Sequence, residues 1–258
     1  MRMTFLGTGG AVPTATRDNT SLLIETGQSL LLVDCPGGMT QKIFKSGYEP
    51  KQVSAIFITH LHTDHVYGLP SFVHSQMLES MQVKLLGSEE TVNFCLQLLD
   101  LFHLRKDKIL YRIDPQPLSH GLQTEVLPGI LVTGLKVPHH SSSMAFLFQT
   151  PEGKILYSGD TPVSEDVCSQ ADNVDCLVHD CSTPSRYFEI FPFLKTMHTN
   201  SLELGLVAQK SRVKLLVPCH FFSDLDFSIK EVEQEIRKNY TGQLFLPEDF
   251  QVLEVGRK

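Results

Sequence analysis

The sequence contains no tryptophan, no apolar run of 18 residues and no excess of basic residues. The missing apolar run excludes a membrane-spanning helix. Lys and Arg number 22 against 29 Asp and Glu, so the formal net charge is −7. An acidic chain has no general attraction for phosphate backbones. A nucleic-acid-binding role would therefore need a local basic patch or a metal ion.

Cysteine is present but follows no pattern. The six cysteines include no Cys-x-x-Cys pair, and six in 258 residues do not make a disulfide framework. This usage is typical of a reducing compartment. The apolar run at residues 3–6 is too short for a signal peptide. We therefore expect a cytoplasmic protein.

The composition is that of a folded protein. Hydrophobic residues make up 41% and charged residues 20%, which excludes disorder and coiled coil as the main state. No repeat, low-complexity tract or linker divides the chain. A chain of this length can bury a large core, and we expect one domain spanning residues 1–258.

Short apolar segments rich in β-forming residues alternate with segments of helical periodicity. We expect strands at residues 3–6, 21–25, 30–34, 55–59, 83–87, 129–137, 145–150, 154–158, 176–180 and 215–218. We expect helices at residues 40–46, 90–104, 201–210 and 228–239, the last with Ser228 as its N-cap. Strands in both meander and helix-connected arrangements predict an α/β fold of two sheets covered by helices.

The strongest pattern directly follows the expected strand at residues 55–59. His60, His62, Asp64 and His65 fall within six positions, and neutral imidazoles with a carboxylate suit Zn²⁺ or a similar ion. His60 and His62 are two positions apart, so an extended backbone points them the same way. Asp64 and His65 follow the bend and can face a second ion. The alternative, a polar loop that is histidine-rich by chance, fits this spacing poorly.

Three later strands end in further candidate ligands. His139 and His140 follow one strand, Asp160 follows the next, and His220 follows a third. Loops at strand ends are common places for functional groups because the sheet holds them rigidly. A single histidine there is more often a surface or capping residue, but the recurrence favours one shared site.

These segments resemble the metallo-β-lactamase-fold hydrolases and, within them, the ribonuclease Z-like branch. The resemblance is carried by the stretches at residues 5–13, 33–38, 57–70 and 157–161. The His-x-His-x-Asp-His core is specific for the fold, whereas the following Gly-Leu-Pro and the opening Leu-Gly-Thr-Gly are typical of the branch. The resemblance implies a four-layer αββα sandwich and a homodimer.

The resemblance also implies two metal sites built by seven side chains. These are His60, His62 and His139 for one site, Asp64, His65 and His220 for the other, and Asp160 as the bridge between them. His139 is preferred over His140 because the branch has an aromatic residue seven positions after the ligand, where Phe146 stands. We expect two divalent ions, Zn²⁺ first and Mn²⁺ as the alternative.

Two such ions would lower the pKa of a shared water, hold it as hydroxide, and neutralise charge on a phosphoryl or carbonyl oxygen. The resemblance implies that Asp180 orients His198, which would act as general acid toward the leaving oxygen; Asp64 is counted as catalytic with them. The branch usually has Glu where Asp180 stands, so the reach here is one methylene shorter. The alternative role for His198 is to cap the helix that begins near residue 201.

Two departures from the branch concern the substrate. His139 and Asp160 are 21 positions apart, which leaves no room for the tRNA-gripping arm of some ribonuclease Z enzymes. His220 is followed by Asp224 and Asp226 and by no nearby arginine. Together with the net charge, these departures argue against stable tRNA binding and favour a small phosphodiester or an RNA end.

We therefore expect a metal-dependent phosphodiesterase. Two alternatives stay open: a hydrolase of carbonyl substrates such as lactones or thioesters, and a binding protein without activity. A lactonase would more often have a tyrosine near the metals, and the sequence identifies none. Residues 70–138 are expected to form a packed helix pair rather than a lid. The segment at residues 183–196, which contains several aromatic side chains, could line the pocket or contact a second subunit.

Overall fold

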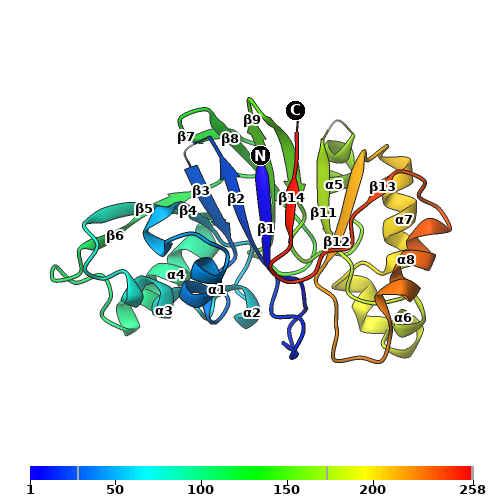
Figure 1. Ribbon diagram of the computed structural model, residues 1–258, viewed down its shortest axis with the longest axis horizontal. Coiled ribbons are helices and arrows are strands. Elements are labelled where there is room, and N and C mark those ends of the chain that lie inside the picture. Colours follow the sequence, from blue (N-terminus) through cyan, green and yellow to red (C-terminus); the bar gives the residue numbers. More distant parts are fainter. Residues whose placement is uncertain (28, 173, 257–258) are drawn as a thin grey trace.

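The computed structural model describes residues 1–27, 29–172 and 174–256. Two seven-stranded sheets pack face to face, and helices cover both outer faces (Figure 1). The predicted four-layer αββα sandwich is confirmed. Within the described part of the chain, no helix is long and apolar enough to cross a membrane.

The first sheet takes most of its strands from the N-terminal half of the chain. In spatial order they are β14 (Val252–Glu254), β1 (Arg2–Gly7), β2 (Ser21–Thr26), β3 (Ser29–Val33), β4 (Val53–Phe57), β5 (Met81–Gly87) and β6 (Tyr111–Pro117). Neighbours from β14 to β3 are antiparallel, and those from β3 to β6 are parallel. The helices α1 (Met39–Lys45), α3 (Leu69–Ser75) and α4 (Glu89–Leu101) pack on its outer face.

The second sheet repeats this plan with the later half of the chain. In spatial order its strands are β13 (Gln243–Leu244), β12 (Leu215–Cys219), β11 (Cys176–Asp180), β10 (Gly153–Tyr157), β9 (Met144–Thr150), β8 (Ile130–Lys136) and β7 (Gln123–Leu127). Neighbours from β13 to β10 are parallel, and those from β10 to β7 are antiparallel. The helices α5 (Glu165–Ala171), α7 (Ser201–Lys210) and α8 (Ile229–Arg237) cover its outer face.

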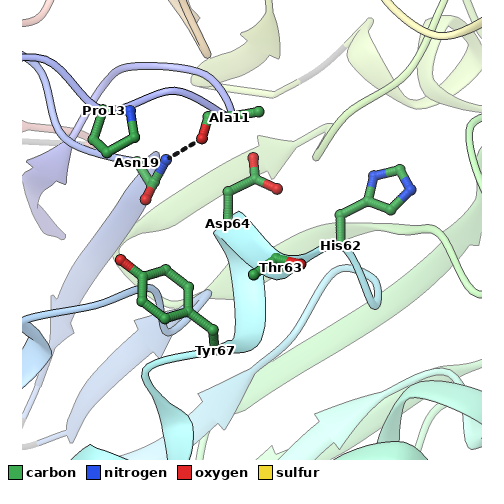
Figure 2. A pocket seen from close by; sticks show the side chains of 7 residues that line it. All are labelled: Ala11, Pro13, Asn19, His62, Thr63, Asp64 and Tyr67. Atoms are coloured by element: carbon green, nitrogen blue, oxygen red, sulfur yellow. Dashed lines mark hydrogen bonds between the residues drawn. The ribbon is translucent and has the colours of Figure 1, made fainter.

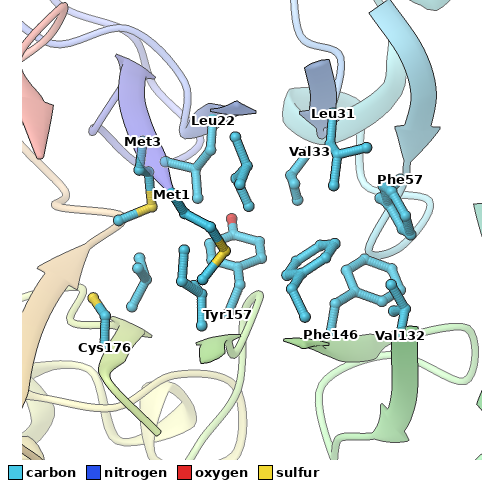
Figure 3. Packing of buried hydrophobic residues seen from close by; sticks show 14 of the residues in the cluster. Met1, Met3, Leu22, Leu31, Val33, Phe57, Val132, Phe146, Tyr157 and Cys176 are labelled. Atoms are coloured by element: carbon cyan, nitrogen blue, oxygen red, sulfur yellow. The ribbon is translucent and has the colours of Figure 1, made fainter. Parts of the chain in front are cut away.

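Central strands are apolar along their whole length because both of their faces are buried. In β4, Phe57 points into the core between the sheets, whereas Ile56 points toward the helices. The ring of Phe57 meets Phe146 and Phe148 of the opposite sheet edge to face, with centroids 5.4 and 5.0 Å apart. Figure 3 shows this inter-sheet core with Met1, Met3 and Tyr157.

The expected strands match observed strands to within two residues. Ser228 caps α8 as predicted, since its hydroxyl accepts a hydrogen bond from the Glu231 amide. The helix expected at residues 90–104 ends earlier, at Leu101, and His103 adopts a positive φ of 59°. The sequence-based interpretation missed the short or polar elements: α2 (Thr63–Val66), α5, α6 (Arg186–Ile190), the 3-10 helices η1 (Pro50–Gln52) and η2 (Pro192–Thr196), and β6, β7, β13 and β14.

The structure also shows how residues 70–138 and 183–196 fold, which the sequence left open. Residues 70–138 contribute α3 and α4 to the covering layer, but they also form β5 to β8. The predicted helix pair therefore accounts for only part of this segment. Residues 183–196 fold into α6 and η2. The interval between His139 and Asp160 holds only β9, a tight turn and β10, as expected.

Candidate metal centre

The first group of candidate ligands consists of three histidines from two loops. His60 and His62 follow β4, and His139 follows β8. Their ligand nitrogens all lie within 4.8 Å of one another, and Nδ1 of His62 is 3.0 Å from Nε2 of His139. The structure therefore brings together the three side chains assigned to the first site. His140 belongs to no ligand group: its ring lies 5.5 Å from that of His62, and its Nδ1 is 2.9 Å from the Ser142 hydroxyl.

The second group adds two carboxylates. Ligand atoms of Asp64, His65, Asp160 and His220 also lie within 4.8 Å of one another. Oδ2 of Asp160 is 3.1 Å from Nε2 of His220 and 3.3 Å from Nε2 of His65. The same oxygen is 3.9 Å from Nε2 of His60 and from Nε2 of His139. Asp160 thus faces both groups, which is the position that a bridging ligand requires.

The donor set fits a pair of metal ions. Nε2 of His60 and Nε2 of His65 are buried, and neither makes a hydrogen bond to any described residue. Buried polar atoms rarely lack partners. With Zn–N bonds of about 2.0–2.1 Å, ligand atoms around one ion are separated by roughly 3.3 Å. Two imidazole-rich groups sharing a carboxylate match a dinuclear centre in ligand type and spacing.

The histidines of the first group are held neutral. Burial lowers the pKa of His60 well below its usual value, and the nearby His65 lowers it further. Burial also lowers the pKa of His62 and of His139, with other histidines adding to the effect. A neutral imidazole keeps the lone pair that a metal needs. These three side chains are therefore ready to bind a cation without first losing a proton.

Opposite charges meet in the second group. Burial alone would raise the pKa of Asp160, but His220 and His65 hold it well below its usual value. Burial alone would lower the pKa of His220, yet Asp160 and Asp64 raise it to about 9. Carboxylates that attract protons onto their histidine neighbours attract a divalent cation in the same way.

Groups behind the ligands fix their orientation. Asp34, at the end of β3, has its Oδ2 2.8 Å from Nδ1 of His65, and its Oδ1 accepts hydrogen bonds from the amide and hydroxyl of Thr59. Nδ1 of His139 is 2.6 Å from the carbonyl oxygen of Met197. Such contacts choose the tautomer and aim the other ring nitrogen at the metal. The sequence-based interpretation assigned Asp34 no role, although Asp34, like the ligands, directly follows a buried strand.

We expect Asp34→Asn to weaken metal binding about 10- to 100-fold. The new amide would place an NH₂ group where Nδ1 of His65 now finds a carboxylate oxygen, so His65 would lose its orientation. Competition with a chelator, read as metal content after dialysis, measures the change. Asp166→Asn is the matched control because the Asp166 side chain is 53% exposed. Equal affinity in the two variants would contradict the role given to Asp34.

A carboxylate–histidine pair lies beside the ligands. Oδ2 of Asp180 is 2.9 Å from Nδ1 of His198 and accepts a hydrogen bond from the Thr161 amide. The ring of His198 lies 4.9 Å from that of His139 and stacks on that of His220 at 5.3 Å. His198 does not cap α7, since that position is held by Asn200, whose side chain accepts from the Glu203 amide.

A pocket of about 490 Å³ opens next to the two ligand groups. Its lining residues are Ala11, Pro13, Asn19, His62, Thr63, Asp64 and Tyr67 (Figure 2). The sequence identified no tyrosine near the metals, and this was wrong, because Tyr67 borders the same pocket as Asp64. Tyr67 was overlooked because it follows the ligand motif within residues 57–70, where the residues after the motif served only to identify the family resemblance.

Known proteins are similar to this chain over most of its length. The model of the family described as Anti-Pycsar protein Apyc1 matches residues 1–226. Ribonuclease Z from Methanosarcina acetivorans is 25% identical, with 99% of this chain and 98% of the relative covered. Ribonuclease Z from Prochlorococcus marinus (strain AS9601) is 30% identical, with 85% of this chain and 88% of the relative covered.

Solved structures give the same picture of the fold. The metallo-β-lactamase fold protein YhfI from Bacillus subtilis superposes with a TM-score of 0.81 at 19% identity, covering 98% of each chain. The short form of human tRNase Z superposes with a TM-score of 0.79 at 22% identity, covering 100% of each chain. The chain therefore belongs to the Anti-Pycsar protein Apyc1 family and is a metallo-β-lactamase-fold hydrolase related to ribonuclease Z.

Proposed function

We propose that this protein is a dinuclear metal-dependent phosphodiesterase whose substrate is a small phosphodiester. The observation that carries the proposal is the Asp180–His198 pair beside the candidate metal centre. A ring nitrogen of His198 lies within 4.8 Å of ligand atoms of His139 and Asp160. A proton donor is thus available next to the place where a metal-held phosphoryl group would be cleaved.

When bound, the metal ions would supply an activated water and would neutralise charge on a phosphoryl oxygen. The chain's own residues handle the leaving group. Asp180 engages Nδ1 of His198, so Nε2 is free to deliver a proton to an alkoxide oxygen. The Thr161 amide fixes the same carboxylate oxygen of Asp180, which keeps the imidazole in place.

The cations near the pocket support a small substrate. Arg17 is buried and donates to the Thr8 hydroxyl and to the Pro247 carbonyl oxygen. Lys42 is buried as well and forms an ion pair with Asp18 at 2.8 Å. Because both cations are engaged within the protein, neither is free to track the backbone of a long RNA. A substrate with a single phosphodiester needs no such contacts beyond the metal centre.

Hydrolysis of a carbonyl substrate is the second candidate function. The observation that favours it is the position of Tyr67 at the edge of the pocket. Its phenol borders the pocket with Asp64 and His62. The hydroxyl, however, lies against Gly37, where an added Cβ would overlap it, and Figure 2 shows it directed away from Asp64. A phenol in this position is poorly placed to assist at the metals, so the phosphodiesterase remains the proposal.

Four substrates separate these functions when the chain is loaded with Zn²⁺ or Mn²⁺. We expect turnover of bis-p-nitrophenyl phosphate and of a 3′,5′-cyclic nucleotide, and little or none of a lactone or a tRNA precursor. Both diesterase activities should disappear in His62→Ala, because His62 belongs to the first ligand group. Lactone hydrolysis without diester hydrolysis would establish the second candidate. Metal binding without turnover of any of the four substrates would indicate a binding protein without activity.

A further inference from the structure

The backbone that carries His198 belongs to the connection between β11 and α7. Residues 185–201, here called the His198 segment, comprise α6, η2 and the residues that lead into α7. Within the segment, the amides of Met197 and His198 donate to the Leu194 carbonyl oxygen at 3.0 and 2.8 Å. The Met197 carbonyl oxygen in turn lies 2.6 Å from Nδ1 of His139. The position of this segment therefore affects both the proposed proton donor and one candidate metal ligand.

The two ends of the His198 segment meet at Glu235 of α8. Oε2 of Glu235 accepts hydrogen bonds from the Ser185 amide at 2.8 Å and from the Ser201 hydroxyl, and Oε1 accepts from the Ser185 hydroxyl at 2.6 Å. One carboxylate oxygen thus contacts both the start of α6 and the start of α7. The backbone closes the loop next to it, since the Ser201 amide donates to the Thr183 carbonyl oxygen at 3.0 Å. The segment is therefore a closed surface loop with Glu235 between its ends.

The helix that carries Glu235 is fixed to the body of the protein. Ile236 is fully buried in the cluster that joins α7, α8 and the second sheet. A Cβ on Gly205 of α7 would lie only 2.5 Å from the Ile236 carbonyl oxygen, so the two helices approach closely at this point. Figure 1 shows α6, α7 and α8 on the same side of the molecule. The Glu235 carboxylate is therefore held from a rigid element.

The hydrogen bonds favour the charged form of Glu235. Burial alone would raise the pKa of this carboxyl group, but the hydrogen bonds from Ser185 and Ser201 lower the pKa below its usual value. Hydrogen bonds to an ionised acceptor are stronger than those to a neutral one. The three contacts therefore constrain the ends of the His198 segment more than neutral contacts would.

A proton donor needs a fixed backbone as well as a fixed ring. Asp180 orients the ring of His198 through the contact at 2.9 Å, whereas the backbone belongs to the His198 segment. We infer that Glu235 is a positioning residue for the proposed reaction: it joins the two ends of the His198 segment and thereby sets the place of the His198 imidazole beside the metal centre. The inference rests on the proposed phosphodiesterase function. Glu235 belongs to neither ligand group and acts only through the segment.

Substitution of Glu235 by alanine removes all three hydrogen bonds. A displacement of about 1 Å at a catalytic group can cost about 10²-fold in rate. At saturating metal, we therefore expect Glu235→Ala to lower kcat about 10- to 100-fold on a 3′,5′-cyclic nucleotide, whose leaving alkoxide needs a proton. The loss on bis-p-nitrophenyl phosphate should stay below about threefold, because p-nitrophenolate departs without protonation. Glu233→Ala is the matched control, since Glu233 is exposed on the same helix.

The conservative variant separates positioning from charge. In Glu235→Gln, the amide oxygen can accept from the Ser185 amide and the Ser201 hydroxyl, while the NH₂ group donates to the Ser185 hydroxyl. We expect Glu235→Gln to stay within about threefold of the wild type on both substrates. A loss as large as that of Glu235→Ala would overturn the inference. Equal losses of Glu235→Ala on the two substrates, with circular dichroism unchanged, would also overturn it.

Ser201→Ala tests the same link with a smaller change and decides the matter alone if Glu235→Ala does not fold. It removes one of the three hydrogen bonds, and Asn200 still caps α7. We expect the same selectivity for the cyclic nucleotide, with a loss of about three- to tenfold. The loss in the double variant should be smaller than the product of the two single losses, because both changes remove one shared interaction. Equal losses of Ser201→Ala on the two substrates would overturn the inference.

Amide hydrogen exchange tests the segment without any turnover. We expect exchange at residues 186–200 to be at least about tenfold faster in Glu235→Ala than in the wild type, and unchanged in Glu235→Gln. Unchanged exchange in Glu235→Ala would overturn the link between Glu235 and the segment while leaving the phosphodiesterase intact. Failure of the wild-type chain to hydrolyse any diester would instead overturn the proposed function, and the catalytic role of Glu235 with it.

Discussion

Replacing Asp160 by alanine is expected to abolish diester hydrolysis, with kcat falling at least about 10³-fold. The reason is the position of one oxygen atom. Oδ2 of Asp160 lies 3.1 Å from Nε2 of His220 and 3.9 Å from Nε2 of His60, so it faces both ligand groups. Without it, two neighbouring cations would repel each other across the gap. We expect the metal content of Asp160→Ala to fall from two ions per chain to at most one.

Metal content by mass spectrometry and turnover of bis-p-nitrophenyl phosphate measure the effect on the same sample. The matched control is Asp166→Ala, which removes an exposed carboxylate a few residues further along the chain and should leave both quantities unchanged. Circular dichroism of both variants shows whether the fold is retained. An Asp160→Ala chain that still holds two ions and keeps more than about a tenth of its turnover would remove Asp160 from the bridging role.

Much of this centre could be predicted because its ligands follow apolar strands. His60, Asp160 and His220 come shortly after the carboxyl ends of β4, β10 and β12, and the sandwich brings those ends to one edge. These strands can be recognised in the sequence as continuous apolar runs because they are buried on both faces. Asp180 ends β11 between β10 and β12, which is why it reaches the same edge.

The rest depends on contacts between distant parts of the chain. Asp34 reaches His65 across 31 positions, and its backbone adopts a φ of 59°. The pocket is lined by Asn19 and Tyr67, which are 48 positions apart in the chain, and no local pattern encodes their proximity. α2 and α6 are too short to show a helical period, and β6 and β7 are half exposed and rich in polar residues. For these elements, tertiary packing decides the structure.

Removing the imidazole of His198 is expected to slow the enzyme selectively, according to the leaving group. An alkoxide such as the ribose oxygen of a cyclic nucleotide needs a proton as it departs, so His198→Ala should lower kcat about 10²- to 10⁴-fold on that substrate. p-Nitrophenolate departs without protonation, so bis-p-nitrophenyl phosphate should lose less than about tenfold. Asp180→Asn should give the same selectivity with a smaller loss, because it weakens the contact at 2.9 Å that orients the ring.

This selectivity distinguishes a proton donor from a metal ligand. A ring nitrogen of His198 lies within 4.8 Å of ligand atoms of His139 and Asp160, so a ligand role would also be compatible with the distances. If His198 held a metal, its removal would lower the metal content and slow both substrates alike. A general acid instead leaves the metal content unchanged and makes the rate depend on the basicity of the leaving oxygen. The role is therefore decided by the rates of a series of aryl diesters, plotted against the pKa of the leaving group for the wild type and for His198→Ala. A steeper dependence in the variant identifies His198 as the proton donor. Equal slopes for the two proteins rule this role out.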